Sequence, residues 1–206
     1  MRLLTALVVL GACGFAIIRG WDVVGFAKAQ VQHHSDVAQP TPVRSWIDTP
    51  GLTGAALKAS LAQMAPGTSV DDARKRADIL AMLLAVRPLS PSDWLSLAGA
   101  RLVTGESQQE VLSALTMSYV AGPNEGAVML ERAIFGLLQW ETLPKVVLTR
   151  TIHDLAGAIL GTAIGDNGMN VVKAVLNAKS SETRSQIARM LRAEEVSAVV
   201  LARMGL

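Results

Sequence analysis

Two prolines, Pro88 and Pro123, divide the middle of the chain at positions 35 residues apart. Each follows an apolar segment with helical spacing and precedes a new helix start. In Ser90-Pro91-Ser92-Asp93 a serine stands at the N-cap, a proline at the first helical position and a carboxylate in the first turn. The turn 104–106 and the capping box 107–110 then open a second helix. The pattern predicts a repeated unit of helix, tight turn, helix and proline stop.

The amino-acid composition also favours helices over strands. Aromatic residues make up 4% of the 206 residues, whereas hydrophobic residues make up 50%. A chain of this length and hydrophobicity can bury a core, and small or unbranched apolar side chains favour packed helices over a sheet of β-branched and aromatic residues. We expect an all-α fold, with the folded domain in residues 52–206.

Further start and stop signals predict the other helices. Ser69 has capping-box spacing to Asp72, and Gly122-Pro123-Asn124 both ends one helix and starts the next. The predicted elements are a helix over 52–64, one from about 70 to Pro88, the pair described above, one over 127–140, a longer helix after 142–144, a break at 165–168, a short helix over 169–178, and a last helix capped by Ser180 or Ser181.

The N-terminal segment predicts a membrane anchor. Residues 3–18 are uncharged and apolar, and Arg19-Gly20-Trp21-Asp22 follows them. The segment reaches the length of about 20 residues that a span needs if residues 20–24 lie in the interface, with Arg19 and Trp21 as anchors. We therefore expect residues 1–29 to hold the chain in a membrane through residues 3–24.

Two other fates of this segment stay open. Ala27-Lys28-Ala29 before Gln30 matches a signal-peptide cleavage pattern. Leu10-Gly11-Ala12-Cys13 is similar to the bacterial lipobox, although the residues after Cys13 stay apolar. All three fates carry the remaining chain out of the cytoplasm. The predicted location is the inner membrane, single-pass, with the C-terminal domain in the periplasm.

Residues 30–51 lack an apolar period and contain three prolines, which predicts a linker. His33, His34 and Asp36 lie in it. Adjacent histidines lack the i, i+4 spacing of a helical metal site, so we predict neither a metal nor another cofactor.

No catalytic constellation stands out in the folded part. His153 stands beside Asp154, but no Gly-x-Ser-x-Gly elbow accompanies them. Glu141 and the adjacent Glu194-Glu195 are explained as solvated helix faces. The net charge of +2, with its basic residues scattered, gives no footprint for nucleic acid. We expect a protein that is not an enzyme.

The helix-turn-helix-proline unit with a period near 34 resembles the tetratricopeptide repeat. The resemblance rests on Trp94, Leu97, Ala98 and Pro123, which fall at or within one residue of the tryptophan, leucine, small-residue and proline positions of that repeat. Residues 52–164 would then hold three degenerate copies.

The resemblance weakens at two positions, since Arg101 stands where the repeat has an aromatic residue and Glu110 where it has alanine. An irregular helical bundle is the alternative fold. The segments 88–99 and 122–126, behind an anchor, are also similar to small envelope proteins of alphaproteobacteria, some of which accompany surface-polysaccharide assembly.

The first helices of a tetratricopeptide array line its concave face, where partner peptides or helices bind. Ser96, Arg101 and Glu131 are the candidate partner surface. The functional hypothesis is a membrane-anchored periplasmic scaffold or adaptor for protein–protein interaction in an envelope complex, with surface-polysaccharide assembly or export as the process that the resemblance implies. The alternative is an accessory subunit or enzyme acting on cell wall or polysaccharide.

Overall fold

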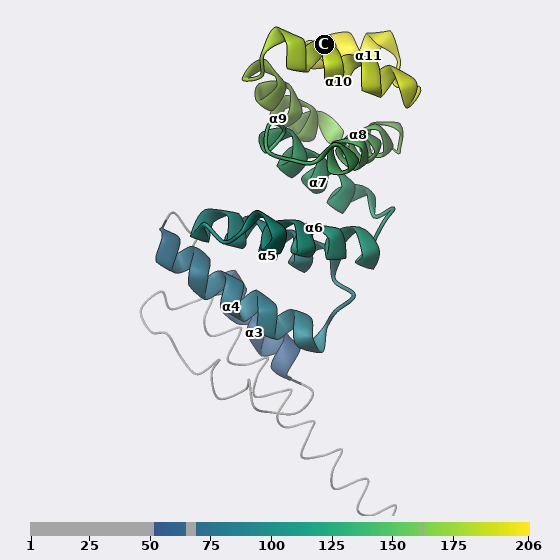
Figure 1. Ribbon diagram of the computed structural model, residues 1–206. Coiled ribbons are helices and arrows are strands. Elements are labelled where there is room, and N and C mark those ends of the chain that lie inside the picture. Colours follow the sequence, from purple (N-terminus) through teal and green to yellow (C-terminus); the bar gives the residue numbers. More distant parts are fainter. Residues whose placement is uncertain (1–51, 65–68, 162) are drawn as a thin grey trace, which may run out of the picture. The chain divides into compact units, whose positions relative to one another are not determined.

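A computed structural model describes residues 52–64, 69–161 and 163–206 of the chain (Figure 1). All regular secondary structure within these ranges is helical, which confirms the all-α prediction. None of the helices described there is both long enough and apolar enough to cross a membrane. The predicted anchor at 1–29 and linker at 30–51 lie outside the described residues.

The chain divides into two compact units, residues 1–87 and 88–206. In the first unit, α3 (Thr53–Gln63) packs along α4 (Val70–Val86). The Ser69 hydroxyl caps α4 by accepting from the Asp72 backbone N–H at 3.1 Å, as its spacing predicts. Apolar side chains from both helices form the small core of this unit: Ala56, Leu57, Leu80, Leu83 and Leu84.

The second unit contains the remaining described helices. Its elements are α5 (Pro91–Thr104), α6 (Gln108–Ala121), α7 (Gly126–Leu138), α8 (Lys145–Leu160), α9 (Gly165–Asn177), α10 (Ser181–Ala193) and α11 (Ala198–Met204). Helices α5 and α6 form one antiparallel hairpin, and α7 and α8 form the next. Helix α7 also contacts α5 and α9, α9 contacts α11, and α8 contacts α10. The first helices of successive hairpins therefore follow one another.

The helix start and stop signals around Pro88 and Pro123 set helix ends as predicted. Ser107 and Glu110 form both halves of a capping box, and Gly105 ends α5 in a left-handed conformation with φ of 73°. The Ser90 hydroxyl behaves differently, because it donates to the Asp93 carboxylate at 2.6 Å and caps no backbone N–H. Helix α5 still begins with Pro91, whose ring fixes a helical φ.

The helix is broken as predicted, but the break lies between Leu160 and Gly165 and not at 165–168, because α9 begins at Gly165 and runs through these residues. Burial of Val172 and Leu176 holds the helix against its neighbours. Gly168 packs so close to α7 that a Cβ there would lie 2.8 Å from the Leu130 side chain. Gly168 is therefore a site of close helix packing, where tertiary contacts outweigh the low helix propensity of glycine.

The prediction that the helix capped by Ser180 is the last one is also wrong. Ser180 does cap α10, but α11 follows it, with Ser197 as its N-cap. Helix α11 has seven residues, which leaves too few apolar positions to show a period. The burial of Leu201 and Met204 holds it in place.

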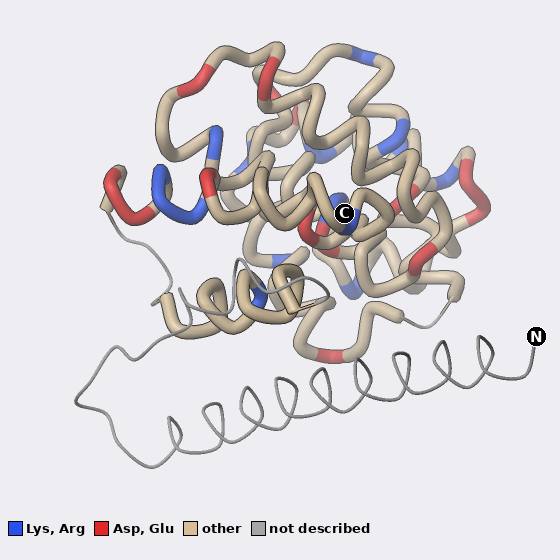
Figure 2. Tube along the Cα trace, turned by 90° about the horizontal axis from the view of Figure 1, so that it is seen from below, with Lys and Arg blue, Asp and Glu red and all other residues tan. Residues whose placement is uncertain are grey.

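One apolar core connects α7 to α11. Its largest fully buried members are Leu137, Ile152, Leu155, Leu176, Ile187 and Leu191. Burying each such side chain contributes roughly 1.5–3 kcal/mol. Charges of both signs are spread along the described helices (Figure 2), as the scattered sequence pattern predicts.

Candidate functional site

A buried arginine joins three helices of the second unit. Arg132 of α7 has no exposed surface and forms a bidentate ion pair with Asp154 of α8, with N···O distances of 2.8 and 3.1 Å. It also donates to the carbonyl oxygens of Ser118, Gly122 and Pro123 at 2.9–3.1 Å. Each of the five N–H donors of a guanidinium can therefore have an acceptor here.

The three carbonyl groups belong to the end of α6 and the residues after it. The last carbonyls of a helix lack intrahelical donors and need other partners. Arg132 supplies them from α7, while Asp154 neutralises its charge from α8. The cluster thus ties the end of the first hairpin to both helices of the second.

Tyr119 lies against this arginine. The Arg132 guanidinium is 4.5 Å from the centre of its ring and the Arg150 guanidinium 5.2 Å, both within the range of cation–π interactions. The Tyr119 hydroxyl is buried without a hydrogen-bond partner of good geometry. Burial raises the pKa of Tyr119 to about 12, and the neighbouring Asp154 carboxylate adds to the effect.

Burial also raises the pKa of Asp154, while its hydrogen bonds and ion pair with Arg132 oppose that shift. Neither of the two surface grooves described below is lined by a member of this cluster. The donors and acceptors of Arg132 and Asp154 are turned toward each other and toward the backbone. The arrangement suits a structural clasp between hairpins.

The structure places two of the three candidate partner residues at matching positions. Ser96 is exposed on α5, and Glu131 is exposed on α7. Each is the sixth residue of its helix, since α5 begins at Pro91 and α7 at Gly126. Because α5 and α7 are neighbours, Ser96 and Glu131 belong to equivalent surfaces of adjacent first helices.

Arg101 lies elsewhere on α5. Five residues after Ser96, it is turned by about 140° around the helix axis. Its guanidinium is half-buried, pairs with Glu106 at 3.2 Å and donates to the Glu110 carbonyl oxygen at 3.1 Å. Arg101 therefore braces the turn between α5 and α6, and the structure does not bring it together with Ser96 and Glu131.

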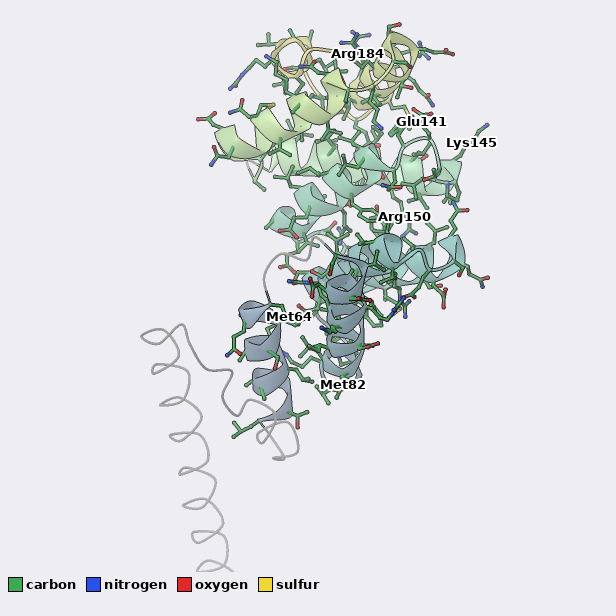
Figure 3. All side chains as sticks on the ribbon, turned by 90° about the vertical axis from the view of Figure 1, so that its left-hand side faces the viewer. Met64, Met82, Glu141, Lys145, Arg150 and Arg184 are labelled. Atoms are coloured by element: carbon green, nitrogen blue, oxygen red, sulfur yellow. The ribbon has the colours of Figure 1, made fainter. Side chains whose placement is uncertain are left out.

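Long-range polar pairs connect α8 and the α7–α8 connection to α10, and no local sequence pattern predicts them. His153 Nδ1 lies 3.1 Å from Glu194 Oε2, joining α8 to the end of α10 across 41 positions. Glu141 accepts from the Thr183 hydroxyl at 3.3 Å. Glu141 and Lys145 mark the outer edge of the connection between α7 and α8 (Figure 3). These acidic residues pair with side chains of other helices, and none pairs with a second carboxylate.

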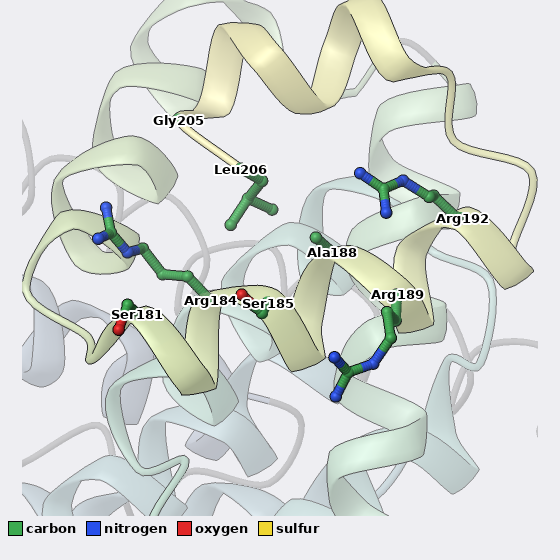
Figure 4. Close-up of a pocket in the computed structure, with 8 residues that line it drawn as sticks. All are labelled: Ser181, Arg184, Ser185, Ala188, Arg189, Arg192, Gly205 and Leu206. Atoms are coloured by element: carbon green, nitrogen blue, oxygen red, sulfur yellow. The ribbon is translucent and has the colours of Figure 1, made fainter.

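Two shallow grooves lie on the surface of the second unit. One follows α6 and is lined by uncharged side chains of that helix, Gln109, Leu112, Thr116 and Met117 among them. The other lies between α10 and α11, has a volume of about 510 Å³, and carries three arginines, Arg184, Arg189 and Arg192 (Figure 4). No local sequence pattern marks either groove.

The described residues contain no group of three or more His, Cys, Asp or Glu side chains placed to hold a metal ion. Comparisons of the chain with family models, with curated proteins and with solved structures found no match. Functional assignment therefore depends on the surfaces of the molecule itself.

Proposed function

We propose that this chain is a membrane-tethered helical scaffold that binds a protein partner in a cell-envelope complex. Its helix pairs would form an array of the tetratricopeptide kind. In support, α5 and α7 begin 35 positions apart, and each packs along its own second helix and contacts the next first helix. In arrays of this class, successive first helices present one continuous surface to a peptide or helix.

The observation that carries the proposal is the repeated surface of α5 and α7. Ser96 and Glu131 are exposed at equivalent positions. Seven residues later, Val103 and Leu138 are again equivalent, and 52% and 56% of their surfaces are exposed. We call these four residues the first-helix face. Aligned polar and apolar side chains on adjacent helices suit a partner helix that contacts both.

The tether and the location extend the proposal beyond the described residues. Residues 3–24 would hold the chain in the inner membrane, and residues 30–51 would separate the helices from the bilayer. The second unit would then meet its partner in the periplasm, within a complex that assembles or exports surface polysaccharide. This part is motivated by the uncharged segment at 3–18 and by the resemblance to envelope proteins.

An accessory subunit or enzyme acting on polysaccharide would call for a groove with facing carboxylates. The α6 groove and the α10–α11 groove are lined by neutral and basic side chains. The scaffold is therefore the function that these surfaces favour.

The test of the scaffold is partner capture with the full-length tagged chain from crosslinked, detergent-solubilised membranes. The Ser96→Lys/Glu131→Lys variant changes the first-helix face by three charge units. The control Asp78→Lys/Thr149→Lys makes the same change at exposed positions outside it. We expect the wild type and the control to recover the same partner, identified by mass spectrometry. The face variant should recover about tenfold less of it, as the loss of one or two contacts implies.

Equal recovery by the face variant would reject this surface as the binding site. Failure to recover any partner that depends on residues 52–164 would reject the scaffold itself. The location is tested separately with alkaline phosphatase fused to the C-terminus, because that enzyme becomes active outside the cytoplasm. An inactive, stably expressed fusion would contradict the periplasmic assignment.

A further inference from the structure

The lining of the α10–α11 groove contains three arginines and no acidic side chain. Arg184, Arg189 and Arg192 all come from α10. Within the described residues, none of their guanidinium groups makes an ion pair or a side-chain hydrogen bond. Glu182, Glu194 and Glu195 belong to the same segment of the chain but do not line the groove, so the positive charge is confined to the lining. Arg132 shows the opposite arrangement, with a carboxylate and three carbonyl oxygens around it.

The groove has basic ends and an apolar middle. The side chain of Leu206 lies between Arg184 and Arg192 and faces Ala188 on α10 (Figure 4). Ala188 follows Arg184 by four residues and precedes Arg192 by four, so the three share one stripe of the helix. The hydroxyl of Ser185 borders the same stripe and adds a hydrogen-bond donor.

The dimensions of this stripe select an elongated ligand. Eight residues of α-helix separate Arg184 from Arg192, a distance of about 12 Å along the axis. Their guanidinium groups stand at opposite ends of the groove, so they do not converge on one phosphate ion (Figure 4). In an extended peptide, residues i and i+4 lie about 13 Å apart on the same face, with residue i+2 between them.

We propose that the α10–α11 groove binds an extended acidic segment of a partner protein, with two carboxylates four residues apart on either side of an apolar side chain. The carboxylates would pair with Arg184 and Arg192, since a guanidinium can donate two parallel hydrogen bonds to a carboxylate. The apolar side chain would pack on the partly exposed Leu206, since Ala188 beneath it is already buried. Arg189, at the rim, would attract the acidic segment without entering the central contacts.

An anionic membrane surface fits these observations less well. Lipid headgroups form a broad plane that meets basic residues from several elements. Here the arginines belong to one helix and border a concave groove. An acidic polysaccharide could supply carboxylates along a chain, but it has no apolar side chain for the middle of the groove.

Fluorescence anisotropy tests the proposal with the full-length chain in neutral detergent and a labelled peptide, Glu-Ala-Leu-Ala-Glu. We expect saturable binding that weakens about tenfold or more in Arg184→Glu/Arg192→Glu, because two ion pairs become repulsive. Arg184→Lys/Arg192→Lys keeps the charge and loses the bidentate geometry, so its affinity should lie between the two. A peptide with the same residues in the order Glu-Glu-Leu-Ala-Ala should bind more weakly.

The matched control is Lys145→Glu/Lys173→Glu, which makes the same change in net charge at exposed positions of α8 and α9. It should bind the peptide like the wild type, and so should the Ser96→Lys/Glu131→Lys variant. Circular dichroism should show unchanged helix content in every variant, since the substituted side chains are on the surface.

Equal affinity of the wild type and Arg184→Glu/Arg192→Glu would overturn the proposal. An equal loss of affinity in Lys145→Glu/Lys173→Glu would also overturn it, because that result would indicate attraction by net charge alone. Stronger competition by phosphatidylglycerol in mixed micelles of the same detergent, or by polygalacturonate, than by unlabelled peptide would assign the groove to a membrane or to a polysaccharide and reject the peptide. Because this groove is separate from the first-helix face, either proposal can fail while the other stands.

Discussion

The two hairpins α5–α6 and α7–α8 begin in the same register but are held by different means. Leu97 in α5 and Arg132 in α7 are each the seventh residue of a first helix, and both are buried. Leu97 provides apolar contact alone. Arg132 makes five hydrogen bonds to α8 and to the end of α6. The same position in the unit therefore accepts either an apolar contact or a polar clasp.

The difference separates the contacts that hold one hairpin together from the contacts that join one hairpin to the next. A helix pair needs a side chain that fills the interface, and leucine is sufficient for that. The carbonyl groups at the end of α6 need donors, which leucine cannot supply. Arg132 meets both needs because its stem fills space and its guanidinium reaches the preceding hairpin.

The largest expected effect is the loss of this clasp in Arg132→Leu, which copies α5 into α7. The substitution leaves the Asp154 carboxylate buried without its cation, so we expect the free energy of unfolding to fall by about 3–5 kcal/mol. Urea denaturation of the full-length chain, followed by circular dichroism, measures the change. The matched control is Leu97→Met, which keeps volume and should cost less than about 1.5 kcal/mol.

A second variant separates the ion pair from simple packing. In Arg132→Leu/Asp154→Leu no unpaired charge remains, so this double variant should be more stable than Arg132→Leu. If Arg132→Leu unfolds at the wild-type urea concentration, the two hairpins are equivalent in energy and the contrast between them is wrong.

The second hairpin comparison concerns Tyr119 in α6 and Ala156 in α8, each the twelfth residue of its helix. Of these two residues, only Tyr119 carries a titrating group. Its pKa is raised from 10.0 to about 12 in the folded protein, so the unfolded chain loses this proton at lower pH. The tyrosine contribution to stability is intact below pH 10 and declines as pH rises toward 12, by about 2–3 kcal/mol in total.

Tyr119 is the sole tyrosine of the chain, so its ionisation can be followed directly by tyrosinate absorbance. We expect a midpoint near pH 12 in the folded protein and near 10 in urea. Tyr119→Phe should lose the part of the alkaline destabilisation that depends on this group. A midpoint near pH 10 in the folded protein would mean that the ring is accessible to solvent.

The ends of the hairpin helices could be predicted from the sequence better than the contacts between the hairpins. Pro88, Gly105, the Ser107 capping box and Pro123 set helix ends through the local backbone, and such signals are readable in one dimension. Gly165, with a φ of 50°, stands at the start of α9, whereas Gly168 lies inside the helix because the Leu130 side chain packs closely against it. The short α11 offered too few residues for a periodic pattern.

The candidate site was predictable only where it follows the register. Ser96 and Glu131 share a position in the repeated unit, so a period of 35 finds both. Arg101 was grouped with them, yet its place on the helix turns it toward Glu106 and the α6 backbone. The Arg132–Asp154 pair and the α10–α11 groove arise from residues on separate elements, and no local pattern links them.

The smallest expected effect concerns one interior glycine in each first helix. Gly136 of α7 packs against Thr151 of α8, and a Cβ on Gly136 would lie 2.9 Å from the Thr151 Cβ. Real Cβ atoms do not approach other carbons so closely, so Gly136→Ala should cost about 1–3 kcal/mol by forcing α7 and α8 apart. Gly99 of α5 has no atom within 4 Å of an added Cβ. Gly99→Ala should therefore stabilise the protein by about 0.5–1 kcal/mol through helix propensity.

If the glycine-to-alanine change lowers stability at Gly136 and raises it at Gly99, then α7 and α8 approach each other more closely at Gly136 than α5 and its neighbours do at Gly99. Gly136→Ala/Thr151→Ala should recover part of the loss, because it removes two of the three Thr151 atoms that the new methyl group meets. The three variants are compared by urea denaturation at neutral pH, where Tyr119 stays protonated in every state. If Gly136→Ala stabilises the protein as Gly99→Ala does, the close contact at Thr151 does not exist in solution, and Arg132 alone distinguishes the second hairpin from the first.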